Sequence, residues 1–323
     1  MKILVTGCAG FIGSHCCEKL LAEGHELIGI DNFSRFYAKS TKLQNMQSFR
    51  HHENFTFHEV DLRDKDALHQ CLNREVDLVL HLAAKAGVRP SIEQPADYID
   101  VNVKGTQHLL DWMVQTGCKK LFFASSSSVY GNNPDGAALS ENAVVDQPIS
   151  PYAFSKRSAE LMNYTYHHLY QLDVINARFF TVYGPRQRPD LAIHKFVKLI
   201  DQGHAIEMYG DGASARDYTF VADTVDGVYK AINYLQEHSG IYETLNLGNQ
   251  TPVTLSELIG MIYTTMQKEA NIIRKPMQAG DVNVTHASID KAKSLLGYNP
   301  QTSMSEGIRR FYDWFLTQKN DSN

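Results

Sequence analysis

The first two dozen residues constrain the fold of this chain more than any other stretch. Residues 2–6 form a short strand-like run that leads into Gly7-Cys8-Ala9-Gly10-Phe11-Ile12-Gly13, and a helical pattern follows over residues 14–23. Glycines allow a tight turn and a close backbone approach, and the N-terminus of a helix attracts phosphate. The order of strand, glycine turn and helix therefore predicts a diphosphate-binding corner at the start of a βα unit.

The apolar runs that follow predict a parallel sheet covered by helices on both faces. Residues 26–30, 55–60, 76–81, 119–124 and 174–179 form short apolar runs, and segments with helical periodicity separate them. Such strands, alternating with helices, are typical of parallel sheets in α/β proteins. We expect an α/β fold in which residues 1–180 form a Rossmann-type doubly wound parallel sheet. Residues 181–323 are expected to form mainly a smaller C-terminal substrate-binding lobe, with some later segments returning to the first domain.

Asp31, at the end of the second run, indicates which dinucleotide would bind. It lies eighteen residues after Gly13. A carboxylate there accepts hydrogen bonds from the adenosine ribose hydroxyls and repels a 2′-phosphate. The sequence therefore favours NAD over NADP, although Arg35 and Lys39 follow closely. Asp61, after the third run, is a candidate to bind the adenine amino group, and capping of the next helix is about equally plausible.

The stretch Pro151-Tyr152-Ala153-Phe154-Ser155-Lys156 predicts a proton acceptor on a helix that runs to about residue 170. Residues four apart lie on the same face of a helix, so Tyr152 and Lys156 can point into one site. A free tyrosine has a pKa of about 10, and a nearby ammonium favours the phenolate and lowers that pKa. Taken alone, this spacing is explained better by an ordinary amphipathic helix, so the neighbouring motifs decide.

Two further stretches lie where predicted strands end. The run Leu82-Ala83-Ala84-Lys85-Ala86-Gly87-Val88-Arg89 supplies small residues at the carboxyl end of a strand, where such folds bind ligands. Its arginine could face a diphosphate or a carboxylate. The run Ser125-Ser126-Ser127-Ser128-Val129-Tyr130-Gly131 comes just upstream of Tyr152. It predicts a hydroxyl partner for the substrate, and a plain loop is the alternative.

The N-terminal glycine motif, the serine run and the Tyr152 to Lys156 spacing together resemble the extended short-chain dehydrogenase/reductase family, specifically its nucleotide-sugar epimerases. The likeness covers essentially the whole chain. It implies a tightly bound NAD cofactor and an oxidation at C4 of the sugar that is later reversed on the other face. It also implies three catalytic residues: Ser126, which hydrogen-bonds the C4 oxygen, Tyr152, which takes its proton, and Lys156, which stabilises the phenolate and binds the nicotinamide ribose.

The same resemblance implies two further sets of residues. Those expected to contact NAD are Gly7, Gly10, Phe11, Ile12, Gly13, Asp31, Asn32, Asp61, Leu62, Leu82, Ala83, Ala84, Asn102, Tyr152, Lys156 and Phe179. Those expected to contact a UDP-sugar are Arg89, Ser126, Ser127, Ser128, Tyr152, Thr181, Arg188, Lys195, Phe196, Arg216 and Asp281. Among the latter, residues 192–196 would lie near the uracil, Arg216 near the diphosphate and Asp281 near the uridine ribose. A surface salt bridge to Asp211 or Asp217 is the other interpretation of Arg216.

The serine run also separates the reactions within the family. The 4,6-dehydratases carry Asp and Glu at the two positions after the catalytic Ser/Thr, and the decarboxylases carry Glu at the second. Here these positions are Ser127 and Ser128. Dehydration and decarboxylation therefore lack their expected carboxylate, and the sequence favours simple oxidation and re-reduction at C4.

The preferred sugar is predicted from four segments that are similar to the glucuronate 4-epimerases: residues 86–89, 179–185, 188–190 and 277–282. Their sugar carboxylate is expected to meet Ser127, Ser128 and Thr181. UDP-galactose epimerases usually carry Arg where this chain has Gln278. We therefore predict conversion of UDP-glucuronate to UDP-galacturonate. The segment Arg186-Gln187-Arg188 also resembles enzymes of neutral UDP-hexoses, so a UDP-glucose or UDP-N-acetylglucosamine 4-epimerase stays open, as do a decarboxylase and a non-catalytic NAD-binding sensor.

Composition excludes several other classes of protein. The net charge is −5 with no basic stripe, so nucleic acid is not an expected partner. No apolar run approaches the roughly 18 residues that span a membrane, and no charged and apolar leader opens the sequence, so we expect a cytoplasmic protein. The five cysteines are scattered and predict neither a disulfide framework nor a zinc site, and no metal is expected. The helices at about 95–116 and 151–170 correspond to the family's dimer-forming pair, which implies a homodimer.

Overall fold

A computed structural model describes residues 1–72, 75–269, 271–276 and 282–320 of the chain. Its centre is a seven-stranded sheet in which every neighbouring pair is parallel. The order is β10-β6-β5-β4-β1-β2-β3, and the strands are β1 (Lys2–Thr6), β2 (Glu26–Asp31), β3 (Phe55–Glu59), β4 (Leu78–His81), β5 (Lys120–Ser126), β6 (Asp173–Phe179) and β10 (Tyr242–Leu247). The strand order reverses between β1 and β4, which confirms the predicted Rossmann-type sheet.

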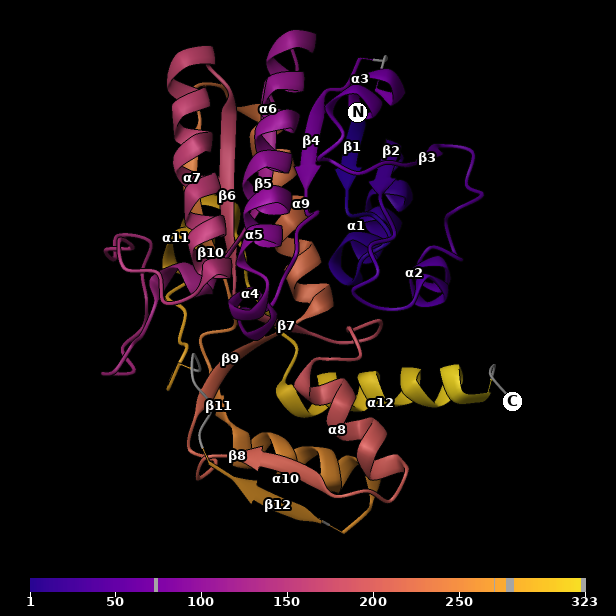
Figure 1. Cartoon of the computed structure of the whole chain (residues 1–323), viewed down its shortest axis with the longest axis vertical. Coiled ribbons are helices and arrows are strands. Elements are labelled where there is room, and N and C mark those ends of the chain that lie inside the picture. The colour runs from indigo at the N-terminus through magenta and orange to yellow at the C-terminus, as the bar shows by residue number, and fades with distance from the viewer. Residues whose placement is uncertain (73–74, 270, 277–281, 321–323) are drawn as a thin grey trace.

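Helices cover both faces of this sheet (Figure 1). Alternate residues of β1 show why, because Ile3 and Val5 join one buried apolar cluster whereas Leu4 joins another. The first cluster includes α1 (Phe11–Ala22) and α9 (Val221–Glu237). The second includes α3 (Lys65–Cys71), α6 (Gly105–Thr116) and α7 (Pro151–Tyr170). The sheet is thus buried on both sides, as its apolar strands predicted.

The shorter elements near the carboxyl ends of the strands shape the site. They are α2 (Lys39–Asn45), α4 (Val88–Glu93), α5 (Pro95–Tyr98), the π-helix η1 (Ile99–Lys104) and the 3₁₀-helix η2 (Ser127–Tyr130). The single helix expected over residues 95–116 is therefore continuous but contains a π-helical segment. Strand β5 extends two residues beyond its predicted end and takes in Ser125 and Ser126.

The second half of the chain forms a smaller lobe below the sheet (Figure 1). It contains a three-stranded sheet in the order β11-β9-β7 and a two-stranded sheet of β12 and β8. These strands are β7 (Thr181–Tyr183), β8 (Ile206–Tyr209), β9 (Ala215–Phe220), β11 (Pro252–Thr254) and β12 (Ile272–Lys275). The remaining helices are α8 (Ala192–Asp201), α10 (Leu255–Met266), α11 (Asp290–Leu296) and α12 (Met304–Asn320).

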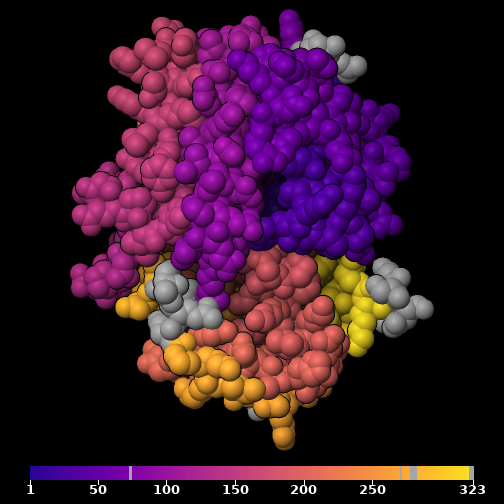
Figure 2. All heavy atoms as spheres, viewed as in Figure 1, coloured from indigo at the N-terminus to yellow at the C-terminus, as the bar shows by residue number. Residues whose placement is uncertain are grey.

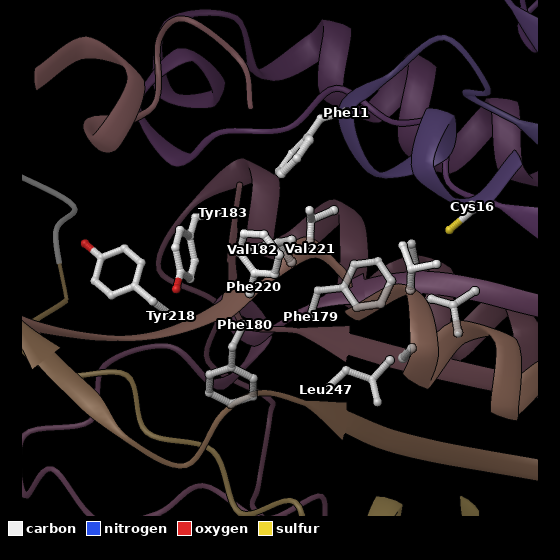
Figure 3. Close-up of a cluster of buried hydrophobic side chains, with 14 of the residues drawn as sticks. Phe11, Cys16, Phe179, Phe180, Val182, Tyr183, Tyr218, Phe220, Val221 and Leu247 are labelled. Carbon is white, nitrogen blue, oxygen red and sulfur yellow. The ribbon is translucent and has the colours of Figure 1, made fainter. Parts of the chain in front are cut away.

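One apolar cluster joins the sheet to this lobe. Figure 3 shows Phe11 of α1, Phe179 of β6 and Phe220 of β9 within it, and Leu247 of β10 packs in the same cluster. Strand β10 and helix α9 come from the second half of the chain, yet β10 extends the large sheet beside β6. In Figure 2 the upper body and the lower lobe meet across the middle of the visible face. Within the described residues, no helix has the length and apolar character to cross a membrane.

Candidate active site

The start of α7 places the predicted proton acceptor at the edge of the sheet. Ser150 precedes the helix, and its hydroxyl accepts a hydrogen bond from Ala153 N at 3.1 Å. Pro151 occupies the first helical position, where its missing N–H costs nothing. The helix then runs to Tyr170, as predicted. Lys156 is buried one turn after Tyr152, and its Nζ donates a hydrogen bond of 2.7 Å to Ala124 O on β5.

Burial dominates the ionisation of Tyr152. It raises the pKa of the phenol, whereas the Ser126 hydroxyl and the Arg188 guanidinium lower it. The sequence led us to expect a lowered pKa caused by Lys156, and this expectation is wrong for the chain by itself. The reason is geometric, because the Lys156 ammonium is directed to the carbonyl of Ala124 and lies 4.9 Å from the ring centroid of Phe123. The ring of Tyr98 packs edge-on against Tyr152 with a centroid distance of 6.2 Å.

Lys156 itself has an unusual environment. Burial lowers the pKa of its ammonium to about 7, and the carboxylate of Glu160 opposes that shift. His81 lies nearby on β4, and burial together with the Lys156 charge lowers the pKa of its imidazole to about 3. His81 is held between Thr6 and Thr106, whose hydroxyl oxygens lie 2.7 Å and 2.9 Å from its ring nitrogens. The lysine is thus the ionisable group at this site that titrates near neutrality.

The serine run is divided between two roles. Ser126 ends β5, and its Oγ accepts a hydrogen bond from Ser128 N and donates one to Ser128 Oγ, both at 3.2 Å. Ser127 and Ser128 open the 3₁₀-helix η2. Ser125 instead donates to the buried carboxylate of Glu160 at 2.6 Å. Ser126 thus ends the strand and is followed by Ser127 and Ser128, whereas Ser125 links β5 to α7.

The glycine turn has the geometry of a diphosphate cradle. Gly7 has a φ of +75°, and a Cβ there would lie 2.8 Å from Ala83 N. A Cβ on Gly13 would lie 2.1 Å from Gly7 O, so side chains are excluded where the turn meets α1. Gly10 precedes α1 and offers no side-chain cap. The first turn of α1 therefore presents its backbone N–H groups, with Phe11 and Ile12 at their start, to an anion.

Asp31 lies at the end of β2 with a buried carboxylate. Its Oδ1 accepts hydrogen bonds from Phe33 N at 2.8 Å and from Lys42 Nζ at 3.3 Å. Lys42 is itself buried, and no local pattern in the sequence marks it as a partner of Asp31. The sequence singled out Lys39 and Arg35 instead. Lys39 pairs with Glu59 at 2.8 Å, and among the described residues no hydrogen bond or ion pair joins Arg35 to Asp31. The carboxylate fits the ribose hydroxyls of NAD.

Asp61 forms a charged cluster at the outer end of this region. It accepts two hydrogen bonds from the Arg63 guanidinium, at 3.0 and 2.7 Å, and one from Asn32 Nδ2 at 2.9 Å. The hydrogen bonds from Arg63 lower the pKa of the Asp61 carboxyl to about 2. Asp64, rather than Asp61, caps α3, so the capping interpretation is wrong. Residues 61 and 63–66 line an open depression of about 560 Å³, and Leu62 is buried behind it.

Asn102 joins the cofactor side of the site to α7. Within η1, its Nδ2 donates to Lys85 O and to Ser155 Oγ, both at 2.9 Å, and its Oδ1 accepts from Lys85 N at 2.8 Å. Ser155 in turn donates to Tyr152 O. Ala83 N donates to Thr6 Oγ1 at 3.2 Å, which holds the segment containing Leu82, Ala83 and Ala84 against the glycine turn. Asn102 therefore fixes this segment relative to Tyr152.

The residues expected to bind the UDP-sugar come from both parts of the molecule. Arg188 is paired with Asp190 through two hydrogen bonds of 3.0 and 2.7 Å, and it lies 4.8 Å from the ring centroid of Phe36. Arg89 of α4 lies 5.5 Å from the ring centroid of Tyr209 in β8, so it connects the sheet to the lobe. Thr181 begins β7, directly after the Phe179 and Phe180 pair.

The remaining substrate candidates belong to the lobe. Lys195 and the buried Phe196 lie on α8. Arg216 lies on β9 and donates to Ala215 O at 2.9 Å. Asp217 is fully buried and accepts three backbone N–H bonds, from Asn249, Gln250 and Ala287, so it is not a surface partner for Arg216. Asp281 lies outside the described residues, as do Met277 and Gln278.

Comparisons with known proteins agree on one family. Residues 4–311 match the family model described as GDP-mannose 4,6 dehydratase. A UDP-glucuronate 4-epimerase of Thermodesulfobacterium geofontis is 41% identical over 96% of this chain and 95% of its own length. The crystal structure of UDP-glucuronic acid 4-epimerase from Bacillus cereus, in complex with UDP-glucuronic acid and NAD, is 35% identical with a TM-score of 0.91, covering 98% of this chain and all of that one. That of UDP-glucose 4-epimerase with UDP-glucose from Thermotoga maritima is 30% identical with a TM-score of 0.90, covering 99% and 100%.

Proposed function

Because this chain belongs to the GDP-mannose 4,6-dehydratase family of extended short-chain dehydrogenase/reductases, we propose that it interconverts UDP-glucuronate and UDP-galacturonate. Its reaction class is NAD-dependent epimerisation of a UDP-sugar at C4. The observation that carries the proposal is the combination at the end of β5: Ser126 beside Tyr152, followed by Ser127 and Ser128 where a dehydratase would need carboxylates.

The cofactor is NAD, as in the Bacillus cereus relative. The residues of this chain fit it, since the glycine turn has no room for a Cβ at Gly7 or Gly13 and leads into the start of α1, and Asp31 ends β2 where the ribose hydroxyls would lie. When bound, NAD⁺ supplies an acceptor for the hydride that leaves C4 and a donor that returns it. We propose that Gly7, Gly10 and Gly13 admit the diphosphate and that Asp31 selects against a 2′-phosphate.

Tyr152 is the proposed general base for the C4 hydroxyl. Ser126 can hydrogen-bond the same oxygen, since its hydroxyl already stabilises the Tyr152 phenolate. The Arg188 guanidinium lowers the pKa of Tyr152, and we propose that the buried Lys156 ammonium also stabilises the phenolate in the filled site. Removing the proton from the hydroxyl as the hydride leaves C4 yields a 4-keto sugar, and the epimer forms when a hydride returns to the other face of C4 and the proton returns to the oxygen. The net redox change is zero, so the cofactor stays with the enzyme.

The sequence of the serine run argues against the other reactions of the family. Loss of water from C6 requires a general acid and a general base, and Ser127 and Ser128 have hydroxyls that do not ionise near neutral pH. The same argument applies to a decarboxylase. A sensor without activity would not need Ser126, Tyr152 and Lys156 together at one edge of the sheet, so catalysis is the better account.

Selection of glucuronate rests on the hydroxyls around the sugar. Ser127, Ser128 and Thr181 lie at the ends of neighbouring strands, because Ser126 pairs with Phe179 in the register of β5 and β6. We propose that these hydroxyls receive the sugar carboxylate. The alternative substrates are UDP-glucose and UDP-N-acetylglucosamine, which carry a neutral group in place of the carboxylate. The similarity to the UDP-glucose 4-epimerase of Thermotoga maritima is the reason to test them.

Two broader features belong to the same proposal. A homodimer is supported by the exposed apolar side chains Phe154, Leu161 and Tyr164, which all lie on α7. A cytoplasmic location is supported by the five cysteines, all of which are free thiols rather than disulfides.

The test is to incubate the purified protein separately with UDP-glucuronate, UDP-glucose and UDP-N-acetylglucosamine, without added cofactor, and to separate the products by chromatography. The proposal predicts the C4 epimer from UDP-glucuronate alone. An epimer only from a neutral sugar would keep the reaction class and overturn the substrate. Release of CO₂, or no epimer from any of the three even with NAD⁺ added, would overturn the function.

A further inference from the structure

Glu160 is a buried carboxylate that the reaction described above does not use. It lies on α7, one turn after Lys156 and two turns after Tyr152, so the three side chains share one side of the helix. Its exposed fraction is 0%. Carboxylates are almost never fully buried unless they are paired, so its surroundings require an explanation.

Four donors surround this carboxylate. Oε1 accepts hydrogen bonds from Ser125 Oγ at 2.6 Å and Arg178 Nε at 2.9 Å. Oε2 accepts them from Arg178 Nη2 at 2.9 Å and Arg157 Nη1 at 3.0 Å. Arg178 is also buried, and its guanidinium lies 4.8 Å from the ring centroid of Tyr130. The fork between Arg178 and Glu160 fixes both the distance and the plane of the two groups.

Each partner is the immediate neighbour of a residue in the proposed active site. Ser125 precedes Ser126 on β5, and Arg178 precedes Phe179 on β6. The two partners face each other in the strand register, as Ser126 and Phe179 do. On the same helix, Lys156 donates to the carbonyl of Ala124, one residue before Ser125. Lys156 and Glu160 therefore bind consecutive residues of β5, and Glu160 also reaches β6.

Stability alone does not account for this cluster. Burying an ion pair is often no better for folding than packing apolar side chains of the same size, whereas its geometry is far more specific. Of the three elements that Glu160 joins, β5 carries Ser126, α7 carries Tyr152 and Lys156, and β6 carries Phe179. Their alignment decides whether the C4 hydroxyl can lose its proton while the C4 carbon loses a hydride.

We propose that Glu160 is a positioning residue for the epimerase reaction: it locks α7 onto the ends of β5 and β6, so that Ser126 and the pair of Tyr152 and Lys156 keep their relative positions. The inference rests on the proposed function. The groups that face this cluster are Arg157 and Lys156 on α7, Arg178 on β6, Tyr130 on η2 and Tyr242 on β10. The two arginines are permanently charged, and Glu160 is the carboxylate of this set.

The main test compares Glu160→Gln with wild type, with Glu160→Asp as the conservative variant and Glu237→Gln, at the exposed end of α9, as the matched control. We expect Glu160→Gln to lower kcat by about 10- to 100-fold with KM for the UDP-sugar nearly unchanged. The alkaline limb of the kcat profile should move to lower pH, because an uncompensated Lys156 loses its proton earlier. Glu160→Asp should recover part of the kcat and part of the shift in the pH profile, and Glu237→Gln should match wild type.

A second readout does not depend on turnover. The ionisation of Tyr152 is followed by tyrosinate absorbance, with the same protein carrying Tyr152→Phe as the background. Removal of a negative charge by itself would lower the pKa of Tyr152. Loss of the Ser126 contact would raise it, so we expect a rise of about half a pH unit or more in Glu160→Gln.

Ser125→Ala covers the case in which Glu160→Gln fails to fold. It removes the link from Glu160 to the serine strand and leaves the ion pair with Arg178 intact, so a fall in kcat of roughly 3- to 10-fold is expected with a modest fall in melting temperature. The proposal is overturned if the kcat and the Tyr152 titration of Glu160→Gln match those of wild type. Where Glu160→Gln does not fold, the same comparison is made with Ser125→Ala. It is also overturned if kcat falls while the pH profile and the Tyr152 titration stay unchanged. A wild-type protein that epimerises no UDP-sugar overturns the proposed function instead, and the Tyr152 titration still decides the role of Glu160.

Discussion

Tyr152 shows at the scale of one residue how burial and charge compete. Its phenol is removed from water, which raises its pKa, and the two groups that oppose this are the Ser126 hydroxyl and the Arg188 guanidinium. A base with a raised pKa is mostly protonated at neutral pH. In the chain by itself, the Arg188 guanidinium is the cation that opposes this shift, whereas the Lys156 ammonium is held by the carbonyl of Ala124.

Replacing Tyr152 by Phe should leave binding intact and remove the base. We expect kcat for UDP-glucuronate epimerisation to fall by about 10²- to 10⁴-fold, which is the usual contribution of a positioned general base. The measurement is steady-state conversion followed by chromatography, with bound nucleotide quantified in the same sample. Tyr234→Phe on α9 is the matched control and should be fully active. A Tyr152→Phe variant with near-normal turnover would remove the tyrosine from the mechanism.

His81 gives the clearest expectation for pH dependence. The folded chain keeps its imidazole neutral down to about pH 3, whereas the same group in the unfolded chain binds a proton near pH 6.5. The unfolded state thus binds more protons in this window, so the free energy of unfolding falls as the pH drops below 6.5. From pH 6.5 to pH 5 this amounts to ~2 kcal/mol.

Urea unfolding at pH 7 and pH 5 measures this effect. Between pH 7 and pH 5, the free energy of unfolding should fall by about that much less in His81→Gln than in wild type, because glutamine does not titrate. The exposed His51→Gln is the control and should behave like wild type. An equal pH dependence in wild type and His81→Gln would show that His81 is protonated in the folded chain.

At the scale of secondary structure elements, α7 was the most predictable part of the site. Ser150 and Pro151 mark its start, and Tyr152 and Lys156 share its face, all of which can be seen in the sequence. Removal of the cap by Ser150→Ala should lower the free energy of unfolding by ~1 kcal/mol, because Ala153 N loses its acceptor. Ser150→Asp should restore most of it. Denaturant unfolding of the three proteins is the measurement, and equal midpoints would show that the cap contributes nothing.

Other elements of the site could not be predicted from local pattern. The sequence does not mark the π-helical segment around Asn102, whose side chain bonds to Lys85 and Ser155, residues distant in sequence. Lys42 and Glu160 were missed for the same reason. Their partners, Asp31 and Arg178, come from strands, and the sequence does not say which charged residues meet across a fold.

The glycine turn and the sheet were predictable because their signals are local. Gly7 and Gly13 have no room for a Cβ, and such positions recur with a fixed spacing between a strand and a helix. The boundary of β5 was missed by two residues because serine favours loops, whereas Ser125 and Ser126 are held in the sheet by pairing with Arg178 and Phe179. Pairing with β6 therefore set the end of β5, which local propensity left ambiguous.

At the scale of the whole molecule, the exposed face of α7 carries the prediction about assembly. Phe154, Leu161 and Tyr164 are about half exposed there, and α6 packs beside α7. Introducing a charge by Leu161→Glu should weaken a homodimer formed through this face by at least roughly tenfold in Kd. Light scattering over a range of protein concentrations measures it. Ile273→Glu on the exposed edge strand β12 is the control and should leave the dimer intact, and a wild-type protein that is monomeric throughout would contradict the assembly.

The central claim is that one active site removes hydrogen from C4 of the sugar and returns it to the other face. The most direct measurement uses UDP-glucuronate carrying deuterium at C4, in ordinary water, with mass spectrometry of both epimers at equilibrium. The account predicts that UDP-galacturonate keeps the deuterium at C4, because it moves as a hydride and stays with the bound cofactor. Loss of the label to solvent, in step with epimerisation, would contradict the account, since it would show that C4 is deprotonated rather than oxidised.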